Sequence, residues 1–300
     1  MPLKYKVVGK TDKGLVRPGN EDYLHLDKNN NVFAVCDGMG GHQAGEVASM
    51  MASELIQTIF DNFRKHIHKD SNLRIDRPLP LSGELLLKSI RLANRAIYNK
   101  ATGSSALLGM GTTIVALALE GDMLSVAHVG DSRAYRLDEK SLTPLTIDHS
   151  WVAEIQQSQK LSEEEAASVV GKNIITRALG VRDTVEVDYR MIKIKPGDRF
   201  ILCSDGLCGY ADDDEIFITV NNVRQDNNRI VDNLIQMAND RGGADNVTIV
   251  ALEIIDINSS TVPEIKKFTL PAETKELLTF EDQWLEQISN FIAEKDNIPP

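Results

Sequence analysis

Residues 32–42 have the sequence VFAVCDGMGGH, and this stretch marks a boundary between a buried strand and a polar turn. The apolar, β-branched run Val32–Cys36 is typical of a buried strand. Asp37 follows it directly, and three glycines among the next four residues predict a tight turn. Residues Gln43–His66 then carry apolar side chains at every fourth position, which predicts a helix with one buried face. The stretch therefore predicts a strand, a turn and a long helix in succession.

Further short runs rich in β-branched residues predict strands along most of the chain: Thr112–Leu119, Leu124–Val129, Ala134–Leu137, Val185–Ile194, Phe200–Cys203 and Val247–Ile255. Other helical patterns lie at Leu85–Tyr98, Ser150–Val170 and Asp226–Asn239. The strands in the middle of the chain follow one another without a helix long enough for a parallel crossover. The sequence therefore favours an α+β fold, in which helices pack outside antiparallel sheets.

The composition is that of an ordinary folded protein. The chain has 300 residues with 33 basic and 44 acidic side chains, a net charge of −11, and 42% hydrophobic residues. A negative balance argues against a protein that binds nucleic acid or an anionic membrane by bulk attraction. We therefore expect neither as a partner.

The cysteines and the N-terminal residues indicate in which cellular compartment the protein is expected. Cys36, Cys203 and Cys208 each lie in or beside an apolar run, which favours buried thiols in a reducing environment over a disulfide framework. Residues 1–10 contain no secretory signal pattern, and no apolar run approaches the roughly 18 residues needed to span a bilayer. We expect a cytoplasmic protein.

Acidic residues stand at the ends of several predicted strands, often next to glycine. A single aspartate in such a place is usually a turn residue. Here five sites share the pattern: Glu21–Asp22, Asp37, Asp131, Asp205 and Asp245. Carboxylates that converge repel one another and lose hydration, so such a cluster needs cations. Oxygen ligands suit Mg²⁺ or Mn²⁺, and two such ions can activate a shared water for attack on a phosphate.

Other phosphate-binding mechanisms lack their motifs. Gly40–Gly45 has the glycine spacing of a P-loop, but Glu46 stands where the lysine is required. No cysteine is followed six residues later by arginine, so a cysteine-nucleophile phosphatase is not indicated. The run Asp212–Asp214 is interpreted as a helix start. Arg17, three residues before Asn20, is a candidate to hold a phosphate in a bidentate fork.

Six motifs in order resemble those of the metal-dependent protein phosphatases, the type 2C serine/threonine phosphatases, and especially their bacterial members. They span about Lys4 to Ile255 and are Arg17–Asp22, Asp37–His42, Gly109–Thr113, Gly130–Arg133, Ser204–Leu207 and Asp245–Thr248. The resemblance implies an αββα sandwich of two antiparallel β-sheets, with the active site at one end. It also implies a substrate-selecting flap at about 148–180.

The same resemblance implies roles for individual residues. Asp37 would bridge two metal ions, the Gly38 carbonyl and Glu21 would bind one of them, and Asp205 and Asp245 would bind the other. Asp22 would hold a metal-bound water, Arg17 would bind the substrate phosphate, and Asp131 is a possible ligand of a weaker third ion. Met39 stands where many relatives have a histidine, which leaves His42 as the candidate general acid. Gly209 stands where relatives often carry an acidic residue, so the third ion would lack that ligand.

The chain is expected to contain a catalytic domain at 1–255, a linker at 256–272 and an amphipathic C-terminal helix at 273–300. Proline and polar residues indicate the linker, and apolar residues on one face indicate the helix. This helix would either dock on its own catalytic domain or contact a partner.

The resemblance implies a metal-dependent serine/threonine phosphoprotein phosphatase that uses two Mn²⁺ or Mg²⁺ ions, with direct attack of water and no phosphoenzyme. Its partners would be phosphoserine and phosphothreonine proteins and a cognate serine/threonine kinase. Two alternatives remain at this point. One is an inactive family member that acts as a regulatory binding module, and the other is a phosphatase of small phosphomonoesters.

Overall fold

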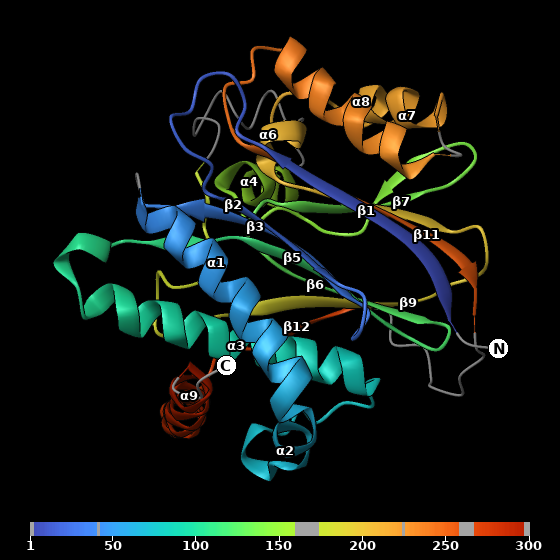
Figure 1. Ribbon diagram of the computed structural model, residues 1–300. Helices are drawn as coiled ribbons and strands as arrows, with labels where there is room; N and C mark the ends of the chain where they lie inside the picture. The colour runs from blue at the N-terminus through green and yellow to red at the C-terminus, as the bar shows by residue number, and fades with distance from the viewer. Residues whose placement is uncertain (1–2, 41–42, 160–173, 224–225, 258–266, 297–300) are drawn as a thin grey trace.

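The computed structural model describes residues 3–40, 43–159, 174–223, 226–257 and 267–296. It contains two antiparallel sheets packed face to face (Figure 1). The first sheet has the order β1 (Lys4–Asp12), β11 (Val247–Asp256), β10 (Arg199–Cys203), β7 (Arg133–Leu137) and β8 (Leu142–Pro144). The second has the order β12 (Phe268–Leu270), β9 (Val187–Lys193), β6 (Met123–Val129), β5 (Ile114–Glu120), β3 (Val32–Met39) and β2 (Asp22–Asp27), and β4 (Gly111–Thr112) pairs with the end of β3. The predicted αββα sandwich is confirmed.

Strand residues alternate between two apolar layers because successive side chains point to opposite faces of a sheet. On β3, Phe33 and Val35 face the other sheet and join the core that includes Phe200 and Leu202 of β10. Ala34 and Cys36, on the opposite face of β3, join the core beneath the helices. A strand buried on both faces explains why residues 32–36 are continuously apolar.

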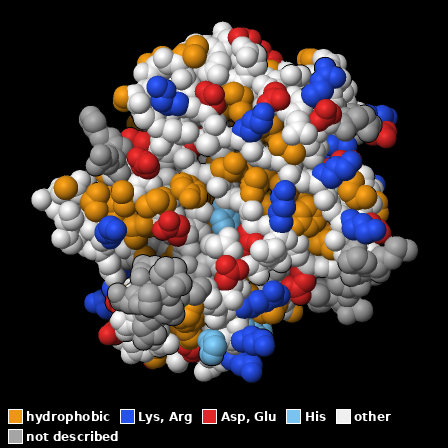
Figure 2. All heavy atoms as spheres, viewed as in Figure 1, with side chains coloured by type: hydrophobic (Ala, Val, Ile, Leu, Met, Phe, Trp, Pro, Cys, Tyr) orange, Lys and Arg blue, Asp and Glu red, His pale blue; other side chains and the backbone are white. Residues whose placement is uncertain are grey.

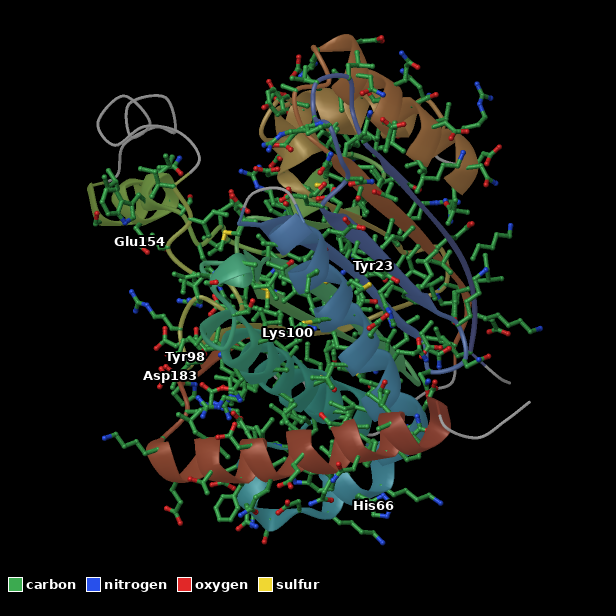
Figure 3. The ribbon with its side chains drawn as sticks, turned by 60° about the vertical axis from the view of Figure 1, so that its left-hand side comes forward. Tyr23, His66, Tyr98, Lys100, Glu154 and Asp183 are labelled. Carbon is green, nitrogen blue, oxygen red and sulfur yellow. The ribbon has the colours of Figure 1, made fainter. Side chains whose placement is uncertain are left out.

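Helices cover both outer faces (Figure 1). The second sheet is covered by α1 (Gln43–Thr58) and α3 (Leu81–Thr102), and a π-helical turn (Ile59–Phe63) links α1 to α2 (Arg64–Lys69). The first sheet is covered by α6 (Asp205–Cys208), α7 (Asp213–Asn221) and α8 (Asn227–Asp240). Short 3₁₀ turns lie at Ser71–Leu73 and Ser105–Leu107, and α4 (Trp151–Gln159) stands apart from the two layers (Figure 3). Asp212 caps α7 through a capping box with Glu215, as the helix-start interpretation of this acidic run predicts.

Residues 258–266 of the linker expected at 256–272 lie outside the described part of the chain. Within 256–272, β12 adds to the edge of the second sheet by pairing with β9. The helix α9 (Lys275–Asp296) then packs on α3 and on the turn at Ser71–Leu73, with Trp284 against Phe63. Apolar side chains on one face of α9 explain this position, because they cover part of the core beneath α1 and α3.

Candidate active site

The register of the strands brings the predicted acidic residues to one end of the sandwich. Asp22 and Asp37 stand directly opposite each other on β2 and β3. In the other sheet β10 ends at Cys203 and its antiparallel neighbour β11 begins at Val247, with Cys203 opposite Ile249. Asp205 follows the end of β10 and Asp245 precedes the start of β11, so both lie at the same end of the sheet. Residues that are far apart in the sequence converge there because antiparallel neighbours begin and end side by side.

Asp37 and Asp205 lie close together among buried acidic residues, and the charge of Asp205 contributes to the raised pKa of Asp37. Burial, followed by the charge of Asp22 and other acidic neighbours, raises the pKa of Asp37 well above its usual range. Burial and the charge of Asp245 also raise the pKa of Asp205. A bound cation would relieve the repulsion among these carboxyl groups.

Asp22 is held by hydroxyl groups from the other sheet. The hydroxyls of Ser204 and Thr248 donate hydrogen bonds of 2.8 and 2.7 Å to its Oδ2 atom. Burial nevertheless raises the pKa of Asp22 to about 7, with Asp205 and Asp245 adding to the effect. Its Oδ1 atom is buried without a hydrogen-bond partner among the described residues. An unpartnered buried oxygen of this kind fits a site that receives a hydrated cation.

Glu21 and Gly38 lie against the start of α1. A Cβ atom added at Gly45 would stand 2.2 Å from Glu21 Oε2 and 2.9 Å from the Gly38 carbonyl oxygen, so these two oxygens border one space. The backbone of Glu21 is fixed on both sides, because its carbonyl accepts from Gly38 N at 3.1 Å and its N–H donates to Asn246 Oδ1 at 2.8 Å. Glycine at position 45 keeps a side chain out of the space beside both oxygens.

Asp131 follows β6 and joins the same group of carboxylates. It is 8% exposed, and its Oδ1 atom has no hydrogen-bond partner in the described part of the chain. Burial, followed by the charges of Asp205 and Asp148, raises the pKa of Asp131 to about 7. Gly209 lies nearby at the end of α6, where its N–H donates to the Asp205 carbonyl at 2.7 Å. Gly209 has no side chain that could add a ligand beside Asp131.

Arg17 lies at the open side of the cluster. Its Nη2 atom is 2.7 Å from Asp245 Oδ2, and half of its side chain is exposed. Burial alone would lower the pKa of Arg17, but Asp245, Glu21 and Asp205 raise it overall. The guanidinium therefore stays charged next to the acidic residues and remains accessible to a ligand. His42 lies outside the described residues.

Several residues that support the cluster were not predicted as site residues. Asn246 is 6% exposed, and its amide nitrogen donates to the Lys13 and Gly19 carbonyls at 2.9 Å each, which fixes the loop that carries Arg17. Thr113 donates its N–H to the Asp37 carbonyl at 2.8 Å, and its hydroxyl accepts from Asp37 N at 3.1 Å. Both residues lie inside the quoted motifs, and this placement was the only signal in the sequence that could have found them.

A second polar cluster has the geometry of a metal site but not its chemistry. Donor atoms of His128, His149 and Asp188 lie within 4.8 Å of one another. Arg177 Nη1, however, is 3.0 Å from His149 Nε2 and 3.3 Å from Asp188 Oδ1, and a guanidinium so close repels a cation. The Nδ1 atom of His149 already accepts from Gly130 N at 3.0 Å. We interpret this cluster as a structural connection between Gly130 and the segment after His149.

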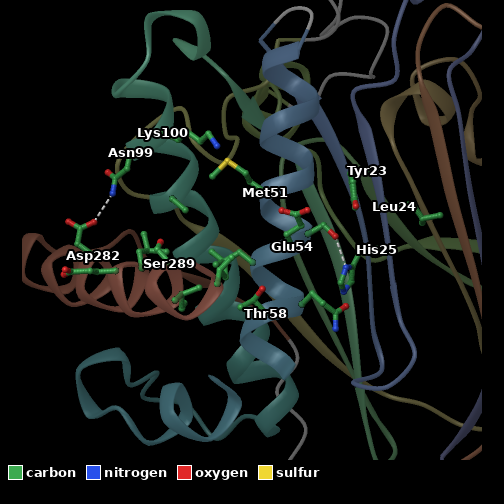
Figure 4. A pocket seen from close by; sticks show the side chains of 18 of the residues that line it. Tyr23, Leu24, His25, Met51, Glu54, Thr58, Asn99, Lys100, Asp282 and Ser289 are labelled. Atoms are coloured by element: carbon green, nitrogen blue, oxygen red, sulfur yellow. Dashed lines mark hydrogen bonds between the residues drawn. The ribbon is translucent and has the colours of Figure 1, made fainter. Parts of the chain in front are cut away.

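A cavity of about 1080 Å³ lies away from the carboxylates, between α1, β2, α3 and α9 (Figure 4). His25 lines it and is held by Ser53 at 2.8 Å, while Asp282 of α9 accepts from Asn99 at 3.1 Å. The free ring nitrogen of His25 has almost no accessible surface, so a molecule in the cavity could not reach it. The cavity therefore offers no convergent chemistry comparable to that of the strand-end carboxylates.

Comparison with known proteins identifies the family. Residues 17–248 match the model of the family described as protein phosphatase 2C. The serine/threonine phosphatase stp of Listeria monocytogenes is 36% identical over 247 residues, which cover 81% of this chain and 94% of the relative. The serine/threonine protein phosphatase PstP of Mycobacterium tuberculosis is 34% identical over 259 residues, 85% of this chain and 46% of the relative. The chain belongs to the protein phosphatase 2C family.

Solved structures agree with this assignment. The catalytic domain of PstP in complex with two manganese ions has a TM-score of 0.71 and 33% identity, and the match covers 85% of this chain and all of that one. Stp1 from Staphylococcus aureus has a TM-score of 0.70 and 30% identity, over 85% of this chain and 96% of that one. Of the helices that the structure describes, none combines the length and the apolar character needed to cross a membrane.

Proposed function

We propose that this chain is a metal-dependent serine/threonine phosphoprotein phosphatase whose active site is the strand-end carboxylate cluster. The observation that carries the proposal is the convergence of buried carboxyl groups at one end of the sandwich, where Asp22 stands opposite Asp37 and the Oδ1 atoms of Asp22 and Asp131 have no hydrogen-bond partner among the described residues. In the described part of the chain, Asp22, Asp37, Asp131 and Asp205 form no ion pair with a lysine or arginine within 4 Å, so the positive charge must come from elsewhere. The two manganese ions bound by the PstP catalytic domain support Mn²⁺ or Mg²⁺ as the source.

The residues present suit two ions. Asp37 stands opposite Asp22 and is close enough to Asp205 to be affected by its charge, and it would bridge the two ions. Glu21 and the Gly38 carbonyl border a space beside Gly45 and would bind the first ion. Asp205 and Asp245 would bind the second. Asp22, held in place by two hydroxyl groups, would orient water bound to an ion through its remaining oxygen.

When bound, the two ions would supply Lewis acidity and a water of lowered pKa. Arg17 would then orient the substrate, since its guanidinium can hold two non-bridging phosphate oxygens in a fork. The ion pair with Asp245 keeps the guanidinium beside the carboxylates, and its exposure leaves donors available. The protein therefore needs only to position the phosphate and the water and to stabilise the charge of the transition state, which is what hydrolysis of a phosphate ester requires.

A phosphoenzyme is not part of the proposal. Cys203 is fully buried and Cys208 is 9% exposed. Hydrogen bonding to Cys203 and burial raise the pKa of Cys208 well above its usual value, so it stays a poorly nucleophilic thiol. We therefore infer direct transfer of the phosphoryl group to water.

Phosphoserine and phosphothreonine proteins are the proposed substrates, as the names of the relatives support. A cytoplasmic location and a cognate serine/threonine kinase belong to the same proposal. An inactive binding module would be expected to lack metal ligands, and the complete set of acidic residues argues against it. For the third ion we propose only weak binding at Asp131, because Gly209 adds no ligand. His42 remains the candidate general acid.

Hydrolysis of a phosphothreonine peptide by Asp205→Asn and by the wild type, each with Mn²⁺, tests the proposal. We expect the variant to lose nearly all activity while keeping the fold, as circular dichroism would check. Full turnover by the variant would contradict the metal assignment.

A further inference from the structure

Exposed apolar side chains gather around the active site. Eleven large hydrophobic residues are exposed in the described part of the chain, and Ile218, Ile255 and Ile292 are the ones remote from the carboxylates. Of the other eight, Trp151 begins α4 and seven lie in loops: Leu15, Val16, Leu108, Ile147, Ile174, Val181 and Tyr210. Single exposed apolar residues are ordinary, but such a concentration at one end marks an interaction surface.

Leu15 and Val16 are held rigidly in solvent beside Arg17. They are 68% and 67% exposed, yet the N–H groups of both donate to the Gly243 carbonyl, at 2.8 and 3.2 Å. Gly14 turns the chain with φ +75°, and a Cβ atom there would stand 2.3 Å from the Asp245 carbonyl oxygen. The loop is therefore pinned to the segment that carries Asp245. Two apolar side chains are presented in a fixed place next to the proposed phosphate ligand.

Tyr210 lies on the same side of the site. It is 40% exposed, and its pKa is raised by burial and then by the charges of Asp245 and Asp205. Its carbonyl accepts a hydrogen bond of 2.6 Å from Arg241 Nη1. The residues that follow Arg241 form the turn to which Leu15 and Val16 are bonded. The backbone of Tyr210 and the backbone of Leu15 and Val16 thus both contact the segment 241–243, which leads to Asp245.

A second apolar area lies across the site, on loops of the other sheet. Leu108 is 71% exposed and precedes β4, which pairs with β3 at Gly38 and Met39. Val181 is 51% exposed, and its Cγ2 atom is 3.1 Å from the position of a Cβ at Gly111. Figure 2 shows hydrophobic side chains over the start of α1 and the loop after α3, at this end of the molecule. Apolar surface therefore borders the carboxylates from both sheets.

We propose that Leu15, Val16 and Tyr210 form a recognition rim that binds a large apolar side chain adjacent to the phosphorylated residue of the substrate. This inference rests on the proposed function. The rim is continuous with Arg17, so a phosphate bound there places the neighbouring residues of the peptide over these three side chains. An acidic neighbour would be disfavoured, because it would approach the acidic cluster in a chain of net charge −11.

Two phosphothreonine peptides, identical except for leucine or serine on both sides of the phosphothreonine, test the rim. The kcat/KM of each is measured with Mn²⁺ for the wild type, for the double variant Leu15→Ser/Val16→Ser and for Tyr210→Ser. Ile218→Ser is the matched control, since Ile218 is 60% exposed on α7 and belongs to the three remote residues. The conservative variants Leu15→Met/Val16→Ile and Tyr210→Phe test for rescue.

We expect the wild type to prefer the leucine peptide by roughly tenfold, mainly through KM, since burial of one or two apolar side chains has about that effect. The ratio should fall to about two or less in the serine variants and stay at the wild-type value in the control and the conservative variants. A merely structural role would lower kcat/KM for both peptides and leave the ratio unchanged.

Equal kcat/KM for the two peptides in the wild type would overturn the rim and leave the phosphatase assignment intact. A wild-type preference that survives in all serine variants would also overturn it, and would assign recognition to another surface. If the wild type with Mn²⁺ hydrolyses neither peptide nor para-nitrophenyl phosphate, the proposed function fails, and the rim fails with it.

Discussion

Two groups of carboxylates lie in different parts of the molecule, and their charges are balanced in different ways. At the strand ends, Asp22, Asp37, Asp131 and Asp205 converge and form no ion pair with a described lysine or arginine. Between α3 and α9, Glu273, Glu281 and Asp282 lie beside arginines. Figure 3 shows α9 along the side of the molecule opposite α7 and α8, away from the loops of the active end.

The α3–α9 group is organised by hydrogen bonds. Arg95 binds Asp282 with two hydrogen bonds of 2.7 Å. Arg91 lies 3.4 Å from Glu273 Oε1, and Glu273 Oε2 accepts from Val185 N at 2.7 Å. These bonds fasten the C-terminal segment to α3 and to the segment before β9. The protein supplies its own counter-charges to Glu273 and Asp282, so these two carboxylates need no ligand, whereas Glu281 is buried with its Oε2 atom unpartnered among the described residues.

The comparison indicates what each group is for. Uncompensated buried charges destabilise a fold, and such strain is retained mainly at functional sites. Carboxylates that are balanced by arginines alone are structural, whereas a cluster of carboxylates that face one another, of which only Asp245 forms an ion pair with a described arginine, is ready for cations. The same substitution should therefore have opposite consequences in the two groups.

The largest effect is expected for Asp37→Asn. Loss of the bridging carboxylate should reduce kcat/KM for a phosphothreonine peptide at least about a thousandfold, since metal ions contribute several kcal/mol to such reactions. In metal-free buffer the same variant should melt at a higher temperature than the wild type, because the repulsion with Asp22 and Asp205 is reduced. Activity assays and thermal melts measure the two effects.

Asp282→Asn is the matched control, since it removes the same charge from the group on α9. It should keep kcat/KM within about twofold and lower the melting temperature, because the hydrogen bonds from Arg95 weaken. Equal losses of activity in both variants would show that the two groups do not differ in kind.

Arg17→Ala is expected to have the next largest effect. Loss of charge-assisted hydrogen bonds to the phosphate should lower kcat/KM roughly 10- to 100-fold. Arg17→Lys should recover part of the loss, because lysine keeps the charge but not the fork. Arg74→Ala, at a site where 73% of the side chain is exposed, should have wild-type kinetics. Wild-type kinetics for Arg17→Ala would remove Arg17 from phosphate binding.

The ionisation of Glu281 predicts a smaller effect, a pH dependence of stability in the α3–α9 group. Burial and the charge of Glu273 raise the pKa of Glu281 from 4.5 to about 8, although Arg91 and Arg95 oppose the shift and Asp282 adds to it. The folded state then holds a proton that the unfolded state has released between these pH values. The contribution of Glu281 to the free energy of unfolding is therefore fully present below pH 4.5 and is lost as the pH rises through 8.

Glu281→Gln should therefore match the wild type at pH 5 and exceed its stability at pH 9 by about 1–2 kcal/mol. Chemical denaturation at the two pH values measures the difference. A wild type that is the more stable at pH 9 would mean that the arginines hold Glu281 ionised.

Much of the site could be predicted because its signals are local. An apolar run followed by Asp37 and glycines predicts the end of a strand, and a similar pattern recurs at Asp205. The support of Asp22 by Ser204 and Thr248 could not be predicted, since it depends on how β2 meets β10 and β11 across the sandwich. The position of α9 also depends on surfaces distant in the sequence, although its apolar face was evident.

Strand β1 was missed because its outer face, which is partly covered by α8, carries Lys4, Lys6 and Lys10, and these residues dilute the apolar pattern. It is an edge strand, and polar residues are common on edges. The helix expected at Gln43–His66 is interrupted by a π-helical turn, Ile59–Phe63. This turn contains no glycine or proline that would have predicted the interruption. Strand β12 lies within the predicted linker and was not predicted, because a three-residue strand is too short to show a periodic pattern.

The most direct test of the central claim is a titration of the metal-stripped protein with Mn²⁺, followed by hydrolysis of a phosphothreonine peptide and by the melting temperature. If the strand-end carboxylates are a metal site, activity should appear only with Mn²⁺, and the same additions should raise the melting temperature. Asp37→Asn should show neither response, and Asp282→Asn should show both. Full activity without metal, or an equal rise in melting temperature in Asp37→Asn, would contradict the account.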